Sequence, residues 1–212
     1  MKSISSLAFI VALALGCGLA QAQDNVVKVG VTRYDTHSKT SGISGIGVPP
    51  GADAKVGDAT TVIFVYERLF TPNIGLELVM GIPPTIKSRA TGSVAFLGDD
   101  VLSAKNWAPT LLANYHFGTP GDTWRPYIGA GINYTKFTDA KSTLASDVKL
   151  GDSWGPAVQV GINYAVTKDI GVFASVAALK VKSHLVAAGS TVLTTTIDFR
   201  PLVYSAGLSY QF

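Results

Sequence analysis

Apolar and polar residues alternate with a period of two along several stretches of this chain. The stretch 125–137 shows the pattern clearly, because every second residue is apolar and the residues between them are mostly small or polar. The apolar series is Ile128, Ala130, Ile132 and Tyr134, and the opposite series is Tyr127, Gly129, Gly131 and Asn133. Successive side chains of a β-strand point to opposite faces, so the pattern predicts strands with one apolar and one tighter, more polar face.

Turn-forming residues divide the chain after residue 25 into eight segments of this kind. We expect strands near 26–35, 60–70, 74–87, 105–117, 125–137, 153–166, 170–183 and 192–212. The connections alternate between short ones (71–73, 118–124 and 167–169) and long ones (36–59, 88–104 and 138–152). Short turns at one end and long loops at the other are typical of bacterial outer-membrane barrels. The sequence therefore predicts an all-β fold, an eight-stranded antiparallel up-and-down transmembrane β-barrel with both termini in the periplasm.

Composition supports the same class of protein. Of 212 residues, 15% are charged and 47% are hydrophobic, whereas a soluble domain has about 25% charged residues. The mean hydropathy is +0.31. Beyond residue 25 the longest uninterrupted hydrophobic run is Val62–Tyr66, far shorter than the roughly 20 residues of a membrane-spanning helix. The chain is too apolar for an ordinary soluble domain and too interrupted for transmembrane helices.

The first residues have the features of a secretory signal peptide. Lys2 supplies a positive charge, Leu7–Leu15 is an apolar core, and Ala20-Gln21-Ala22 is a small-x-small cleavage site. We expect residues 1–22 to be removed and residues 23–212 to form the barrel. Lipoprotein processing at Cys17, the one cysteine of the chain, is the alternative, but the residue three before it is Ala14, where such sites have Leu.

The last segment alternates up to a terminal aromatic residue. Its outward series is Tyr204, Ala206, Leu208, Tyr210 and Phe212. This ending resembles the C-terminal signature by which the barrel assembly machinery recognises bacterial outer-membrane proteins, so Tyr210 and Phe212 are the predicted assembly signal. The alternative is an amphipathic last strand that ends in an aromatic residue by chance.

Several motifs together resemble the OmpW family of small outer-membrane proteins. They are Asn106–Tyr115, the run Arg125-Pro126-Tyr127-x-Gly129-x-Gly131-x-Asn133-Tyr134, Ser153-Trp154-Gly155, Gln159-Val160-Gly161, and Asp198-Phe199-Arg200-Pro201 with the segment on to Phe212. They cover most of the chain in the expected order. One departure is the segment 88–104, which lacks the fuller insertion associated with that family. The resemblance implies an apolar bore that admits small hydrophobic molecules.

The residues that we place inside the barrel give a separate argument for an apolar bore. Barrel interiors are normally polar, yet the predicted lumen includes Ile63, Val65, Val79, Ala108, Leu112, Phe199 and Val203, with Phe173 and Leu179. The predicted lining is mixed, and we therefore expect a narrow, partly apolar conduit for passive uptake of small hydrophobic molecules. The alternative is a structural or receptor barrel whose lumen is filled by its own side chains and whose surface loops bind ligands.

Two further sets of residues bear on this function. Charged residues near the predicted periplasmic end, Lys28, Glu67, Glu77, His116 and Arg125, are candidates for a polar floor that blocks leakage, although some of them are alternatively solvated groups at the interface. Pro83 and Pro84 lack the N–H that a β-ladder needs. They mark a candidate gap for lateral release into the membrane, or alternatively the upper limit of the regular ladder.

Other functions are disfavoured. The net charge is only +3 without a basic block, which argues against a nucleic-acid partner. An acyl-transferring enzyme needs a Ser within reach of a His and a carboxylate. His37 and His184 each have an adjacent Ser, whose side chain would point to the opposite face of a strand, and His116 lies at the wrong end. We expect no catalytic site, cofactor or metal; the expected partners are outer-membrane lipid, the assembly machinery and hydrophobic solutes.

Overall fold

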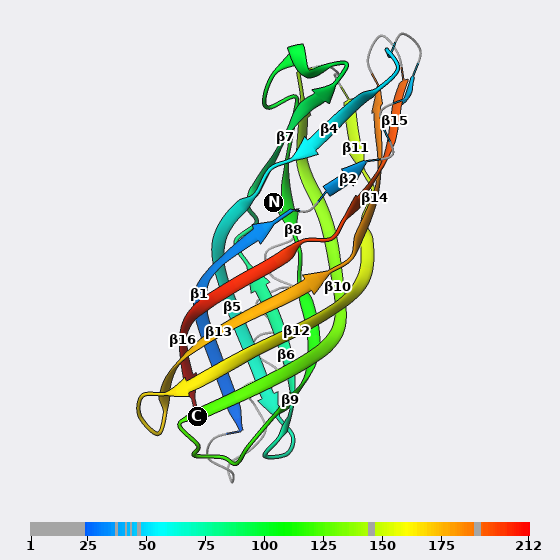
Figure 1. The fold of residues 1–212 in the computed structure, drawn as a ribbon. Helices are drawn as coiled ribbons and strands as arrows, with labels where there is room; N and C mark the ends of the chain where they lie inside the picture. The colour runs from blue at the N-terminus through cyan, green and yellow to red at the C-terminus, as the bar shows by residue number, and fades with distance from the viewer. Residues whose placement is uncertain are drawn as a thin grey trace, which may run out of the picture.

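The chain forms a tall, closed β-barrel with strongly tilted strands in the computed structural model (Figure 1). The structure describes residues 24–36, 38–40, 42, 44–45, 48–143, 147–188 and 192–212, so residues 1–22, predicted to be a signal peptide, lie outside the described part. The strands are β1 (Asn25–Asp35), β2 (Ser38–Thr40), β3 (Ser44–Gly45), β4 (Ala52–Val56), β5 (Ala59–Leu69), β6 (Ile74–Gly81), β7 (Thr85–Gly92), β8 (Leu102–Trp107), β9 (Thr110–His116), β10 (Trp124–Ser142), β11 (Asp147–Leu150), β12 (Ser153–Ala165), β13 (Ile170–Leu179), β14 (Val181–Ala188), β15 (Val192–Phe199) and β16 (Leu202–Gln211).

Eight antiparallel strands close the barrel, which confirms the predicted fold. Their order around the wall is β1, β5, β6, β9, β10, β12, β13 and β16, and β16 pairs with β1. At the end of the seam, Asn25 N–H donates to the Phe212 carbonyl (3.0 Å) and Phe212 N–H donates back to the Asn25 carbonyl (2.9 Å). Closure removes free strand edges, which is the condition for a β-structure to cross a lipid bilayer.

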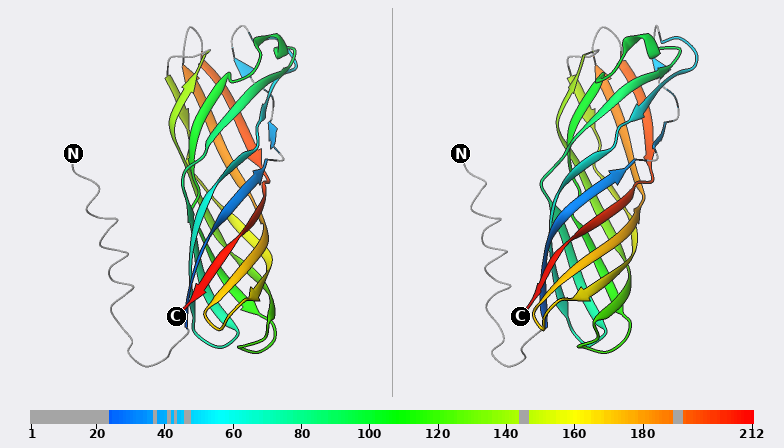
Figure 2. Two further views of the ribbon diagram at one scale, coloured as in Figure 1. Left: turned by 90° about the vertical axis from the view of Figure 1, so that its left-hand side faces the viewer. Right: turned by 60° about the vertical axis from the view of Figure 1, so that its left-hand side comes forward.

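The two ends of the barrel differ. The short connections and the C-terminus lie at one end, here named the turn end, and the long connections lie at the other, the loop end (Figure 2). The long connections contain more strand than the sequence predicted, because β4 pairs with β7 and β15 pairs with β2, β3 and β14. The one helical element among the described residues is a 3-10 turn, Ala95–Leu97. None of the described helices is long and apolar enough to span a membrane.

Pairs of aromatic side chains mark two belts on the outer wall. Trp124 and Tyr164 pack at 4.5 Å between ring centroids near the turn end, and Tyr134 and Trp154 pack at 4.6 Å nearer the loop end. Both pairs lie on the β10–β12 seam, ten residues apart along β10. At a rise of about 3.3 Å per residue and a tilt of about 40°, this spacing corresponds to roughly 25 Å, the height of the apolar band of outer-membrane barrels.

Four predicted strands are interrupted just below the loop end. The breaks separate β6 from β7, β8 from β9, β13 from β14, and β15 from β16. Three of them contain proline: Pro83 and Pro84, Pro109, and Pro201. Proline cannot donate to the ladder, so regular pairing is interrupted at these residues. β8 and β9 both pair with β10, whereas at the other breaks the upper and lower strands have different partners.

Candidate functional site

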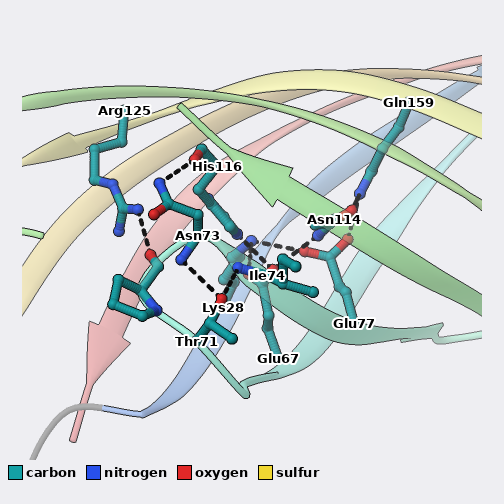
Figure 3. A network of polar contacts seen from close by, with 11 residues as sticks. Lys28, Glu67, Thr71, Asn73, Ile74, Glu77, Asn114, His116, Arg125 and Gln159 are labelled. Carbon is teal, nitrogen blue, oxygen red and sulfur yellow. Dashed lines mark hydrogen bonds and ion pairs between the residues drawn. The ribbon is translucent and has the colours of Figure 1, made fainter. Parts of the chain in front are cut away.

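A network of polar side chains fills the bore near the turn end (Figure 3). Its members are Lys28, Glu67, Glu77, Asn114, His116 and Gln159, and we call this set the polar floor. All six are buried. They come from β1, β5, β6, β9 and β12, so the network links five of the eight barrel strands across the lumen.

Lys28 is the cation at the centre of the floor. Its Nζ donates to Glu67 Oε2 at 3.0 Å and to Glu77 Oε2 at 2.7 Å. The same Nζ lies 5.0 Å from the centroid of the Tyr127 ring and 5.7 Å from that of Phe173. Cation–π attraction is strongest where water is excluded, so the two rings support the ammonium group while they cover it.

The remaining carboxylate oxygens also have donors. Glu67 Oε1 accepts from Asn114 Nδ2 at 2.8 Å and lies 2.7 Å from His116 Nε2. Glu77 Oε1 accepts from Gln159 Nε2 at 2.8 Å, and Gln159 Nε2 lies 2.9 Å from Asn114 Oδ1. Both carboxylates are therefore bonded through both oxygens, which is the arrangement that makes buried charges tolerable.

The pattern of the strands explains why these residues meet. Glu67 and Glu77 are register partners on β5 and β6, and Asn114 and His116 are two residues apart on β9, so each pair shares the inward face. Gly161 makes room beside them: a Cβ there would lie 2.4 Å from Cζ of Tyr127. The ring of Tyr127 fills the space that the missing side chain leaves.

The sequence had placed five charged residues in such a floor, and the structure joins four of them. Arg125 stands apart: its Nη2 donates to the Pro72 carbonyl at 2.7 Å, at the rim of the turn end. Asn114 and Gln159 also belong to the network, although the charge pattern of the sequence does not predict them as members. Both lie at inward positions of their strands, so the alternation pattern contained a signal for them.

Above the floor the bore is narrow and mostly apolar, with the hydroxyl side chains of Thr32, Thr110, Ser175 and Ser205 also in its lining. A lower cavity of about 40 Å³ begins at Lys28 and Glu77. Six residues of the predicted apolar lumen border it: Ile63, Val65, Val79, Ala108, Leu112 and Val203. Phe173 and Leu179 complete the apolar wall. The side chain of the seventh predicted residue, Phe199, lies outside the described part of the chain.

An upper cavity of about 30 Å³ continues the bore toward the loop end. Its lining includes Ile86, Phe137, Val181 and Pro201. Tyr34, Ala108 and Leu179 border both cavities and therefore form the constriction between them. A water molecule needs about 10–15 Å³ of this kind of volume, so in this state each cavity accommodates only a few waters.

The wall has an interrupted seam between β5 and the β6–β7 break, two residues before Ile86, which lines the upper cavity. The ladder ends with Ile63 opposite Gly81, followed by the bond from Ile82 N–H to the Val62 carbonyl at 3.0 Å. The next backbone bond along this seam joins Gly57 N–H to the Lys87 carbonyl. Pro83 and Pro84 occupy the interval, so this part of the wall lacks ladder bonds to β5.

A side chain closes the neighbouring break between β8 and β9. The Nδ2 group of Asn133, which is fully buried, lies 3.3 Å from the carbonyls of Ala108 and Pro109 and donates to Thr110 Oγ1 at 2.8 Å. The amide thus replaces the missing ladder bonds with side-chain bonds.

At Pro83 and Pro84, Thr61 Oγ1 of β5 donates to the Ile82 carbonyl at 2.6 Å, and Asn106 N–H donates to the Pro84 carbonyl at 3.0 Å from the β8 side. In the described residues no hydrogen bond joins β5 to Pro83 or Pro84 themselves.

The other candidate residues of the sequence lie on the outer wall or outside the described part of the chain. Tyr210 and Phe212 face outward at the turn end, with ring centroids 5.8 Å apart. His37 lies outside the described residues, as does the side chain of His184. Within the described part, no three His, Cys, Asp or Glu side chains lie together as a metal-binding group.

Comparison with known proteins agrees with this architecture. The model of the OmpW family matches residues 21–212. Outer membrane protein W of Vibrio cholerae is 29% identical over 220 residues, with 100% of this chain and 99% of the relative covered. The crystal structure of OprG from Pseudomonas aeruginosa superimposes with a TM-score of 0.82 at 27% identity, over 91% of this chain and 97% of that one.

A third relative, from Pseudomonas aeruginosa, is named dibenzothiophene metabolism operon protein PahQ. It is 33% identical to this chain over 118 residues, which are 54% of this chain and 53% of the relative. The family match extends over the whole described barrel, from the first residue of β1 to the end of β16. This chain therefore belongs to the OmpW family of outer-membrane β-barrel proteins.

Proposed function

We propose that this protein is a conduit for passive uptake of small hydrophobic molecules, which enter at the loop end and leave sideways into the membrane. The main support for the proposal is the order of the polar and apolar regions along the barrel axis. A mostly apolar bore stands directly on a hydrogen-bonded polar floor, and above that floor the wall lacks backbone bonds from β5 to Pro83 and Pro84.

The apolar lining favours hydrophobic solutes by a simple physical effect. An apolar molecule that leaves water gains about 25 cal/mol per Å² of surface buried, and no catalysis is needed. The polar floor opposes passage straight through, because an apolar solute cannot replace the bonds among buried charges. The name of the relative PahQ links it to the metabolism of dibenzothiophene, an aromatic and hydrophobic compound, which supports this choice of solute class.

The direction of transport follows from the proposed orientation. The loop end would face the exterior of the cell and the turn end, with both chain termini, the periplasm, because short turns of outer-membrane barrels are periplasmic. Residues 1–22 would serve export, and Tyr210 and Phe212 would be read by the barrel assembly machinery.

The second candidate is a structural or receptor barrel, and the size of the cavities favours it. Volumes of about 40 and 30 Å³ are too small for a dissolved hydrocarbon unless side chains move. A purely structural barrel would show neither flux of a hydrophobic solute nor stabilisation by one.

Uptake into lipid vesicles tests the proposal. The purified protein is reconstituted, and entry of a long-chain alkane or a steroid is measured with and without the substitutions Pro83→Val and Pro84→Thr. These substitutions restore two N–H donors to the break, and because neighbouring residues of a strand point their N–H groups to opposite edges, one of the two faces β5. At about 1 kcal/mol for that bond, the open population falls about fivefold. We expect uptake to fall in proportion.

Pro156→Val is the matched control, because Pro156 pairs with Ile132 inside a continuous ladder. It should leave uptake unchanged. Uptake by the Pro83→Val/Pro84→Thr variant at the original rate would exclude lateral release at this seam. Absence of any uptake by the original protein would exclude the conduit itself.

A further inference from the structure

Two exposed lysines lie on the outer wall where the barrel emerges from its apolar band. Lys180 and Lys182 are two residues apart at the junction of β13 and β14, so both point outward, while Leu179 and Val181 between and below them are buried in the bore. We call these two lysines the basic rim.

The neighbouring strand places the basic rim at the level of an aromatic belt. Lys182 N–H donates to Ser153 Oγ at 3.0 Å, and Lys180 N–H donates to the Pro156 carbonyl at 3.2 Å. Trp154 lies between these two residues on β12, with 69% of its surface exposed. Tryptophan at such a position sits among lipid headgroups, so the lysines reach the same layer.

A third cation faces this pair from the other side. The register pairs Ala178 with Leu202 and Val181 with Phe199, which puts Arg200 opposite Lys180. Like charges in directly opposite positions destabilise a sheet. Because Arg200 has an interaction partner of its own, the inference depends on the two lysines.

Carboxylates neutralise other exposed cations at the loop end but not these lysines. Arg33 pairs with Asp58 at 3.0 Å, Lys87 with Asp100 at 2.6 Å, and Lys105 with Asp139 at 2.8 Å. In the part of the chain that the structure describes, neither Lys180 nor Lys182 makes an ion pair. Asp198 is the register partner of Lys182, and its side chain lies outside that part. Asp152, beside Trp154, accepts a bond from the Tyr134 hydroxyl at 2.6 Å.

The wall below the lysines is apolar. Ala178 lies one outward position below Lys180, and its register partners on the two neighbouring strands are Val158 and Leu202. Positive charge above an apolar surface complements a molecule with a phosphate head and hydrocarbon chains. Long lysine side chains at this depth extend to the interface and leave their stems on the apolar wall.

We propose that Lys180 and Lys182 bind the phosphate of a lipid A molecule in the leaflet that surrounds the loop end. The choice of lipid A over a phospholipid rests on the orientation given under the proposed function, with the loop end at the cell surface. The binding site lies on the outside of the barrel and does not depend on passage of a solute through the bore.

Native mass spectrometry of the mature protein in an uncharged detergent, titrated with bis-phosphorylated lipid A, tests the inference. Each lysine near an anionic headgroup contributes about a fivefold factor in affinity. The double variant Lys180→Gln/Lys182→Gln should therefore bind about thirtyfold more weakly, and Lys180→Arg/Lys182→Arg should bind like the original protein. Heat-dependent mobility in electrophoresis checks that each variant forms the barrel.

Lys55→Gln/Arg89→Gln is the matched control. It removes the same charge from two exposed register partners on β4 and β7, farther from the aromatic belt, and we expect less than about a threefold change. Equal weakening in both double variants, no weakening in either, or equal binding of dephosphorylated lipid A would overturn the inference. Displacement of lipid A by equimolar inorganic phosphate would also overturn it, since the site would then be one for free phosphate. Solute uptake in vesicles without lipid A should persist, so the two proposals fail separately.

Discussion

Glu67 has more partners than Glu77, the second carboxylate of the polar floor. The two oxygens of Glu67 have Lys28, Asn114 and His116 within 3.0 Å. These contacts join β5 to its neighbour β1 and to β9, which lies on the far side of β6. A charge buried to this degree is stable only while the whole set is present, because loss of one partner leaves the others desolvated and unpaired. The floor should therefore respond as a unit to changes in single residues.

The substitution Lys28→Met tests this dependence. It leaves Glu67 and Glu77 buried without their shared cation, so we expect a loss of about 3–5 kcal/mol in the free energy of unfolding. Urea-induced unfolding in lipid vesicles, followed by tryptophan fluorescence, measures it. Adding Glu67→Gln and Glu77→Gln should recover part of the loss. Arg33→Gln, which breaks an exposed ion pair with Asp58, should cost less than about 1 kcal/mol in the free energy of unfolding. Equal losses for Lys28→Met and Arg33→Gln would contradict the prediction that the polar floor is stable only as a whole.

For single residues, the sequence predicts well on which face of a strand a side chain lies, but poorly which partner a long side chain contacts. Charge type and alternation suffice to bring Lys28, Glu67, Glu77 and His116 into one group. Arg125 is one residue from the start of β10. A long side chain at this position can bond to a carbonyl of a neighbouring turn and need not point into the lumen. Strand parity does not determine that choice.

At the scale of elements, the predicted strands agree with the barrel strands to within a residue or two at the turn end and diverge at the loop end. Hydrophobic alternation fixes a strand wherever lipid lies on one side and a packed bore on the other. Above the aromatic belt both faces meet water or small residues, so the pattern fades, and β2, β3, β4 and β11 fall in segments that the sequence predicts as loops. The prolines signalled the breaks, but the role of Asn133 in closing one of them depends on three-dimensional contacts.

Asn133→Leu should weaken the break between β8 and β9. Leu has nearly the same size but donates nothing to the carbonyls of Ala108 and Pro109 or to Thr110 Oγ1. The two carbonyls keep one donor each, Thr110 Oγ1 and Tyr134 N–H. Thr110 Oγ1 loses its donor and buried Thr135 Oγ1 loses its acceptor, so we expect a loss of about 1–3 kcal/mol in the free energy of unfolding. Hydrogen exchange of amides in residues 107–111 should rise with it. Unchanged stability and exchange would show that Asn133 does not hold this break closed.

At the scale of the whole molecule, the bore has two compartments with separate relations to the membrane. The lower cavity ends on the polar floor, and the upper cavity lies beside the interrupted wall. The family and the eight-stranded barrel could be inferred from sequence because motifs and alternation extend over the chain. The division of the bore could not, since the three residues that form the constriction, Tyr34, Ala108 and Leu179, lie far apart in sequence.

Filling one compartment at a time distinguishes lateral release from axial passage. Val181 borders only the upper cavity and Val65 only the lower one, so Val181→Phe and Val65→Phe place the same added volume above and below the constriction. Both should overpack the bore and cost about 1–3 kcal/mol of stability, which makes each the control of the other. If solutes leave above the floor, Val181→Phe should reduce alkane uptake into vesicles several-fold more than Val65→Phe does. An equal reduction by Val65→Phe would show that solutes descend to the floor, and the lateral route would then be wrong.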